Sequence, residues 1–174
     1  KYILGVSSQS KHKNFDMLIK SFNKIKDKDL KLYIIGEKNR NLNNILTKEH
    51  KLNSDVIFTG RVSDQELAEL YSNAVCFVFP SLYEGFGIPP LEAMACGCPI
   101  AVSNVASLPE VCRDAALYFD PLDMEDIAAK ILKVVQNNDM KKTLIRKGFN
   151  QVKKYSWEKS ANKLVINMKK LYKN

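Results

Sequence analysis

Short apolar runs alternate with helical segments along the first two thirds of the chain. Six runs are rich in β-branched and aromatic residues: "KYILGV", "LKLYIIG", "DVIFTG", "VCFVFP", "PIAVS" and "ALYFD". A strand that is apolar along its whole length is typical of a parallel sheet, which helices cover on both faces. We therefore predict an α/β fold: a doubly wound, Rossmann-like parallel sheet of about six strands, forming a single domain over residues 1–174.

The segments between these strands carry helix signals. "NFDMLIKSFNKI" has apolar residues at helical spacing, and "LNNILTKEHKL" also favours a helix. Ser63 and Glu66 form a predicted capping box before "DQELAELYSNA", and "SLPEV" is a predicted short helix with proline in its first turn. After residue 122 the pattern predicts a helical tail over roughly 123–137, 139–154 and 157–172. We expect Ser156 to cap the last helix and Trp157 to anchor it on the core.

Three loops that follow strands are rich in polar residues and glycine: "SSQSKHKN", "GRVSD" and "SLYEGFG". In doubly wound sheets, ligands bind outside the carboxyl ends of the strands, where the strand order reverses. If the order is that of a Rossmann fold, the first and fourth strands are neighbours at this point. The first and third loops then lie side by side.

The loop "SLYEGFG" and the residues after it predict an anion site. Gly85 and Gly87 let backbone amides approach a ligand closely, and "PP" suits the first turn of a helix. Free amides at a helix start favour phosphate. Glu84 precedes the glycines, and Glu92, expected in the first helical turn, could accept hydrogen bonds from both hydroxyls of a ribose. The alternatives are a tight turn for Gly-Phe-Gly and a helix-dipole partner for Glu92.

Composition argues against several other kinds of site. The four cysteines lie in apolar surroundings without zinc or redox spacing, so we expect buried, reduced thiols and no metal site. The net charge of +8 comes mainly from dispersed lysines, which favours solvated helix faces. Attraction to anionic membrane surfaces or phosphorylated ligands comes next. Nucleic-acid binding is least favoured because no recognition motif accompanies the charge. Taken alone, "SKHKN" is typical of a solvated turn in which Asn14 caps the next helix.

The segment "FVFPSLYEGFGIPPLEAMACGCPIAVSNVASLPEV" resembles the donor-binding motif of retaining glycosyltransferases of family 4 (glycosyl transferases group 1), which have the GT-B fold. The family signature is two glutamates separated by seven residues, here Glu84 and Glu92. The similarity extends through "GRVSDQELAELYSNA" and "DAALYFDPLDMEDIA". It is greatest to the branch that resembles mannosyltransferases of polysaccharide and lipopolysaccharide assembly.

The resemblance assigns roles to individual residues. Glu84 and Lys13 are the expected catalytic residues: Glu84 binds hydroxyls of the donor sugar, and Lys13 neutralises the leaving diphosphate without a metal ion. Glu92 binds the ribose. His12 stands where the family usually has arginine, so Lys11 could share in stabilising the leaving group. The other expected donor-binding residues are Arg61, Val62, Gly85, Phe86, Gly87, Ile88 and Leu91.

The implied reaction is retaining transfer of a glycosyl group from a nucleotide diphosphate sugar to an acceptor hydroxyl. The resemblance implies GDP-mannose or a UDP-sugar as donor and no cofactor. It also implies a glycan or lipid-linked acceptor held by an N-terminal domain that we expect to lie outside this chain. We expect a cytoplasmic enzyme at the inner face of the membrane, and a chain that binds donor without transferring it. The alternative is a non-catalytic module that binds nucleotide sugars.

Overall fold

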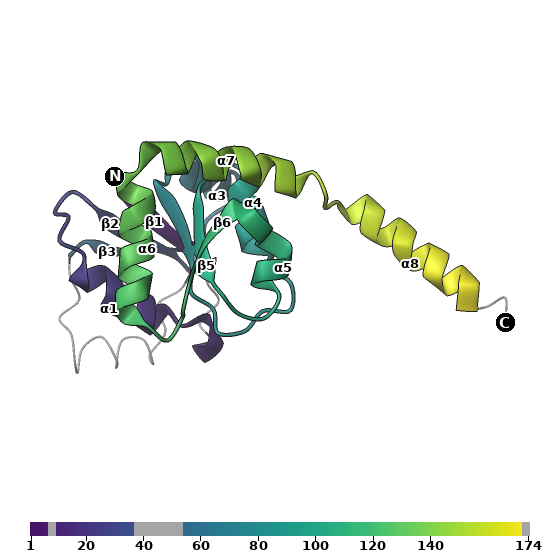
Figure 1. The fold of residues 1–174 in the computed structure, drawn as a ribbon, viewed down its shortest axis with the longest axis horizontal. Coiled ribbons are helices and arrows are strands. Elements are labelled where there is room, and N and C mark those ends of the chain that lie inside the picture. The colour runs from purple at the N-terminus through teal and green to yellow at the C-terminus, as the bar shows by residue number, and fades with distance from the viewer. Residues whose placement is uncertain (7–9, 37–53, 172–174) are drawn as a thin grey trace.

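The computed structural model describes residues 1–6, 10–36 and 54–171 (Figure 1). Its centre is a six-stranded parallel sheet in the order β3-β2-β1-β4-β5-β6, which confirms the predicted Rossmann-like fold. The strands are β1 Tyr2–Val6, β2 Lys31–Ile35, β3 Val56–Gly60, β4 Cys76–Phe79, β5 Ile100–Ser103 and β6 Ala116–Phe119. The helix predicted over 42–52 lies outside the described residues.

Helices cover both faces of the sheet (Figure 1). One face carries α1 (Phe15–Lys24) and α6 (Met124–Gln136), and the other carries α3 (Asp64–Asn73), α4 (Ile88–Ala95) and α5 (Leu108–Cys112). Side chains alternate along a strand, so Ile3 packs into the first core, beneath α1 and α6, and its neighbour Leu4 packs into the second core, beneath α3, α4 and α5. Both cores lie along β1, at the middle of the sheet.

The predicted helix starts are present. The Ser63 hydroxyl accepts a bond from the Glu66 amide, and the Glu66 carboxylate accepts one from the Ser63 amide, which confirms the capping box. The Asp123 carboxylate caps α6 by accepting hydrogen bonds from the backbone amides of Glu125 and Asp126. The proline pair lies in the first turn of α4, and proline is also near the start of α5.

The tail consists of α7 (Asn138–Val152), which contacts α4, and α8 (Trp157–Leu171), which extends away from the sheet (Figure 1). Ser156 accepts a bond from the Lys159 amide at 3.1 Å, as expected of a helix cap. Trp157, however, is 81% exposed, so the prediction that it anchors α8 was wrong. The chain leaves the second core at Tyr155, and α8 is directed outward from there.

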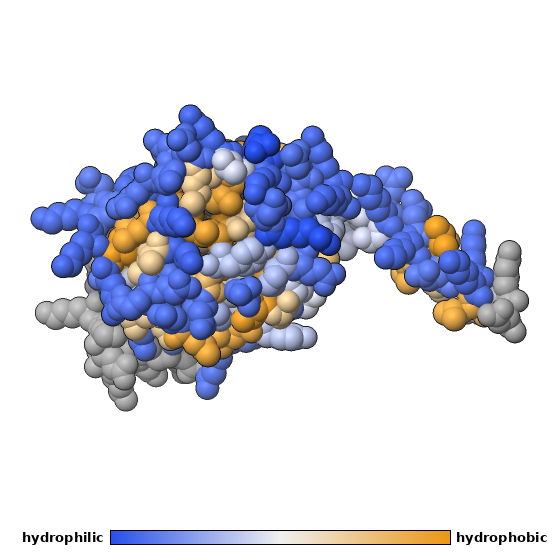
Figure 2. Space-filling model, in the orientation of Figure 1, coloured by the Kyte–Doolittle hydropathy of each residue, from blue (hydrophilic) through white to orange (hydrophobic). Residues whose placement is uncertain are grey.

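The exposed side chains of α8 include an apolar group (Figure 2). Its members are Trp157, Leu164, Val165, Ile166, Met168 and Leu171. Within the described ranges, no helix has the length and apolar content needed to span a membrane.

Candidate functional site

The site lies where the strand order reverses, at the carboxyl ends of β1 and β4. These strands pair over Ile3 with Cys76 and Leu4 with Phe77. The chain leaves β1 toward a short 3₁₀ helix, η1 (Lys11–Lys13), and leaves β4 into the loop 80–87. The Leu82 amide donates to the His12 carbonyl at 2.7 Å, so the two loops that the sequence placed side by side are in contact.

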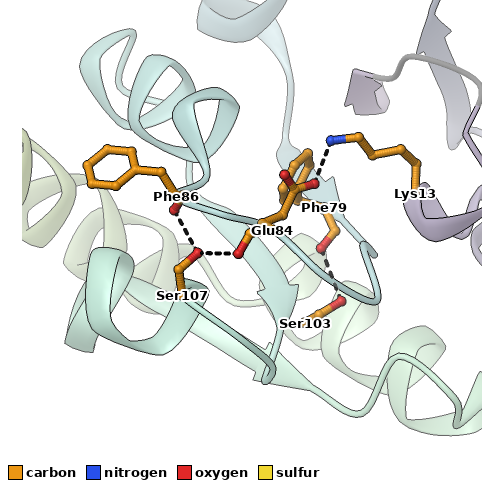
Figure 3. Close-up of polar contacts among 6 residues, drawn as sticks. All are labelled: Lys13, Phe79, Glu84, Phe86, Ser103 and Ser107. Atoms are coloured by element: carbon orange, nitrogen blue, oxygen red, sulfur yellow. Dashed lines mark hydrogen bonds and ion pairs between the residues drawn. The ribbon is translucent and has the colours of Figure 1, made fainter.

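Lys13 and Glu84 form an ion pair between these two loops. The Lys13 Nζ atom lies 2.6 Å from Glu84 Oε1, and their side chains are 16% and 13% exposed (Figure 3). The ammonium group also lies 5.4 Å from the centre of the Phe79 ring, at the end of β4. The pair is therefore sheltered from bulk solvent, although neither side chain is fully buried.

Asn14, in the segment that follows β1, binds the segments that follow two other strands. Its side-chain amide donates to the carbonyls of Pro80, at 3.2 Å, and Pro121, at 2.8 Å, which follow β4 and β6. The alternative of a solvated turn in which the Asn14 side chain caps α1 does not hold, since the residue is buried and its side chain makes no cap bond. A left-handed backbone, with φ of 57°, accompanies this arrangement. No local signal in the sequence distinguishes such a role from capping.

Replacing Asn14 with alanine should lower the free energy of unfolding by about 3 kcal/mol, because two buried carbonyls lose their donor and alanine is strained in the left-handed region. Urea unfolding measures the change. Asn14→Gly is the control, since it relieves the strain but still lacks the amide. A glycine variant as stable as the parent would show that the two hydrogen bonds contribute nothing.

The loop Glu84–Gly87 is supported from the side of α5. The Ser107 hydroxyl lies 2.9 Å from the Glu84 carbonyl and 3.1 Å from the Phe86 carbonyl, and its single proton serves one of them at a time (Figure 3). Ala106, the preceding residue, has a left-handed backbone with φ of 51°. Strain of this kind persists where the surrounding structure fixes it, often at functional sites. Sequence reasoning identified neither residue.

The two glycines of this loop differ. Gly87 has φ of 98°, and a Cβ atom there would lie 2.8 Å from Leu108 Cδ2. No atom lies within 4 Å of the corresponding position on Gly85. Gly87 is thus required by the fold, whereas Gly85 leaves open space over the loop, as a close approach by ligand requires.

Glu92 lies one turn further into α4 than predicted. The helix begins at Ile88, before the proline pair, so no acidic residue lies in its first turn. Because the helix-dipole effect falls off within the first turn, the alternative role for Glu92 loses its basis. Its Oε2 atom instead accepts a bond from the Tyr71 hydroxyl of α3 at 3.2 Å. Sequence reasoning missed Tyr71.

Four of the other predicted residues line a cavity beside α4. Phe86 and Ile88 are exposed, and with Leu91 and Glu92 they line a cavity of about 480 Å³ that reaches the start of α8. Phe86 meets the Tyr155 ring edge-on, at 5.6 Å between centroids.

The loop after β3 carries Arg61 and Val62, and the loop of Lys13 carries His12. Val62 packs on the second core, as does Leu91, and the Arg61 side chain is exposed after β3. The His12 side chain is exposed beside Lys13. The roles expected of these side chains toward a donor stay predictions.

The cysteines take no part in this arrangement. Cys76, Cys98 and Cys112 are buried and unpaired, as predicted, whereas Cys96 is partly exposed. Burial raises the pKa of the Cys76 and Cys112 thiols to about 12, so both stay protonated. Among residues 1–6, 10–36 and 54–171, no three His, Cys, Asp or Glu side chains are grouped so that they could hold a metal ion.

Comparison with known families gives a match to glycosyl transferases group 1 over residues 1–151. The chain belongs to this family. The match includes both loops of the ion pair and all of α3, α4 and α5. The Lys13–Glu84 ion pair and the N-terminus of α4 therefore both lie within the part of this glycosyltransferase domain that matches the family.

Relatives of this glycosyltransferase domain include enzymes of O-antigen assembly. It is 46% identical over 108 residues to O-antigen chain mannosyltransferase B of Escherichia coli, covering 62% of this chain and 28% of the relative. It is 34% identical over 139 residues to O-antigen chain mannosyltransferase RfbU of Salmonella typhimurium, covering 79% of this chain and 39% of the relative. The domain thus spans less than half the length of these relatives.

Solved structures have the same architecture. Sucrose-phosphate synthase from Thermosynechococcus elongatus superimposes with a TM-score of 0.86 at 26% identity, over 98% of this chain and 45% of that one. A glycosyltransferase from Rickettsia africae gives a TM-score of 0.85 at 22% identity, over 99% of this chain and 48% of that one. The expectation that the domain forms one half of a GT-B fold is confirmed.

Proposed function

We propose that this domain binds the nucleotide diphosphate sugar of a retaining glycosyltransferase, which transfers the glycosyl group to an acceptor hydroxyl in polysaccharide, lipopolysaccharide or glycolipid biosynthesis. The observation that carries the proposal is the sheltered pair of Lys13 and Glu84 beside the N-terminus of α4. It combines a cation, free backbone amides and a carboxylate within one small region. A nucleotide diphosphate sugar offers a partner for each of them.

The cationic part stabilises the leaving group. As the glycosidic bond breaks, negative charge develops on the diphosphate, and fixed positive charge nearby lowers the barrier. The Lys13 ammonium supplies a full charge, and the start of α4 supplies partial charge and free amides from Gly85 to Ile88. Exposed His12 and Lys11 flank this position. No metal ion is needed in this scheme.

The two glutamates orient the rest of the donor. Released from Lys13 by the diphosphate, the Glu84 carboxylate accepts hydrogen bonds from sugar hydroxyls. Glu92, further along α4, accepts from the ribose. Backbone at Arg61 and Val62 borders the base. Donor binding thus breaks the Lys13–Glu84 ion pair and replaces it with contacts from Lys13 to the diphosphate and from Glu84 to the sugar.

The relatives narrow the choice of donor and acceptor. Two of them are named as O-antigen chain mannosyltransferases, which favours transfer of mannose from GDP-mannose, with UDP-sugars next. The acceptor, a glycan or lipid-linked sugar, is bound by an N-terminal half outside this chain. The enzyme works in the cytoplasm, at the inner face of the membrane where such acceptors are assembled, and it uses neither a cofactor nor nucleic acid.

A thermal-shift panel of GDP-, UDP- and ADP-linked sugars, with the free diphosphates, tests the proposal on this chain. A ligand that binds only the folded state raises the melting temperature by mass action. Replacing Glu92 with alanine should remove most of the shift caused by a free nucleoside diphosphate, because the ribose loses its acceptor. Glu84→Ala should remove mainly the additional shift that the sugar provides.

Full shifts in both variants would contradict the site. Normal donor binding by this domain, followed by no transfer when it is joined to an acceptor half, would instead indicate a non-catalytic module. Transfer by the 174 residues alone would contradict the expectation that an acceptor half is required.

A further inference from the structure

A buried tyrosine on α3 holds the carboxylate of Glu92. The Tyr71 side chain is 1% exposed, and its ring meets Phe77 of β4 edge-on at 5.3 Å between centroids. Its hydroxyl reaches out of the core and donates to Glu92 Oε2 at 3.2 Å. A buried phenol needs a hydrogen-bond partner, and here the partner is the acidic group that the proposed function assigns to ribose binding.

Among the residues that the structure describes, the Tyr71 hydroxyl is the only hydrogen-bond partner of the Glu92 side chain. The residue is exposed on α4, where a glutamate side chain ordinarily samples several rotamers, and ordering it costs conformational entropy. The Tyr71 ring, by contrast, is held on several sides by the second core. A hydrogen bond from a fixed donor selects the rotamers of Glu92 that keep Oε2 beside it. Oε1 then remains available for ligand hydroxyls.

We propose that Tyr71 is a positioning residue, which pre-orients the Glu92 carboxylate to accept both hydroxyls of a ribose and so gives the site its preference for ribonucleotides over deoxyribonucleotides. This inference rests on the proposed function of Glu92 and deepens it. Pre-organisation removes an ordering cost that each binding event would otherwise include.

The chemical state of the phenol agrees with a donor role. Burial, followed by the nearby Glu92 carboxylate, raises the pKa of Tyr71 above its ordinary value, so the hydroxyl keeps its proton at all physiological pH values. The Tyr71 hydroxyl therefore keeps its proton and donates it in the hydrogen bond to Oε2, which leaves the other acceptor positions of the carboxylate to a ligand. Two vicinal hydroxyls can donate to the remaining acceptor positions of the Glu92 carboxylate, whereas a single hydroxyl leaves one of these positions without a hydrogen bond.

The test is the affinity of the 174-residue chain for GDP and for 2′-deoxy-GDP, with UDP and 2′-deoxy-UDP as the second pair. We expect the parent to prefer the ribonucleotide by about tenfold, the value of one good hydrogen bond to a charged group. Tyr71→Phe keeps the ring and removes only the hydroxyl. It should weaken ribonucleotide binding about fivefold and leave deoxyribonucleotide binding within about twofold, so that most of the preference disappears.

A matched control is available in a tyrosine of β1 that bonds to the same helix. The Tyr2 hydroxyl donates to the backbone carbonyl of Leu70, adjacent to Tyr71, at 2.8 Å. Tyr2→Phe therefore removes a comparable bond to α3 without touching Glu92, and it should leave the preference unchanged. If Tyr71 had a purely structural role, Tyr71→Phe would weaken the binding of both nucleotides equally. The ratio of the two affinities therefore distinguishes a structural role from positioning.

The outcomes distinguish this inference from the proposed function. If Glu92→Ala loses the preference but Tyr71→Phe keeps it, the positioning role is overturned and the ribose role of Glu92 stands. If neither variant changes the preference, the ribose role itself fails. In the double variant Tyr71→Phe/Glu92→Ala, the loss should equal that of Glu92→Ala alone, because both residues act through one carboxylate; additive losses would overturn the inference.

Discussion

Replacing Lys13 with methionine should weaken binding of a nucleotide diphosphate sugar by about 10- to 100-fold, the usual range for a hydrogen bond to a charged group. The substitution keeps most of the side-chain volume and removes only the charge. It also leaves the Glu84 carboxylate, 13% exposed, without its partner, so the loop before α4 becomes less stable. Isothermal titration with the free diphosphate and the sugar nucleotide measures the change, which should appear with both ligands.

Lys24→Met is the matched control, because Lys24 also forms an ion pair, with Glu125, but on the surface between α1 and α6. Exposed pairs of this kind contribute little, and donor affinity should stay unchanged. Glu84→Gln gives a contrasting result: it frees the Lys13 ammonium, so the free diphosphate should bind at least as well as to the parent. Parent-like affinity in Lys13→Met would show that the pair serves only to join the two loops.

Replacing Gly87 with alanine should lower the free energy of unfolding by about 3 kcal/mol, since it combines an unfavourable positive φ with a steric overlap. The added Cβ atom would lie 2.8 Å from Leu108 Cδ2, in a residue that is fully buried. Either α5 or the loop must move, and the amides at the start of α4 move with it. Urea unfolding and donor titration should therefore both show a loss.

Gly85→Ala separates the two effects. A Cβ atom there meets nothing within 4 Å, so stability should change by no more than about 0.5 kcal/mol. If the diphosphate lies over this loop, the same methyl group obstructs it, and donor affinity should fall while stability is kept. Equal destabilisation by the two alanines would mean that the loop conformation described for Gly87 is wrong.

Periodicity was sufficient to predict most of the fold. The six strands and the helices around them follow from apolar runs, capping residues and proline positions, all of which act within a few neighbouring residues. The exposure of Trp157 did not follow, because it depends on the direction in which α8 leaves the core. No local pattern fixes that direction. A large aromatic residue after a helix cap is more often buried, and the prediction for Trp157 followed that tendency.

The candidate site could be predicted in outline but not in its supporting contacts. The loops of Lys13 and Glu84 were expected to lie side by side because parallel strands end at one edge of the sheet. The roles of Asn14, Tyr71 and Ser107 depend on contacts with loops and helices elsewhere in the chain. The sequence around Asn14, taken alone, was explained by a helix cap. Tyr71 offered a partial signal, since a phenol on a buried helix face needs an acceptor, but the relative placement of α3 and α4 decides which one.

The contacts around Asn14 and Lys13 also bear on how the domain folds. Asn14 bonds to carbonyls 66 and 107 residues away, and Lys13 pairs with a residue 71 positions away. Contacts of such long sequence separation incur a large loop-closure entropy and form slowly. An early intermediate built from β1, α1 and β2 would therefore contain no donor site. A donor can therefore bind only after the distant segments around Asn14 and Lys13 have come together. Its binding then stabilises the entire sheet against unfolding, and not one loop alone.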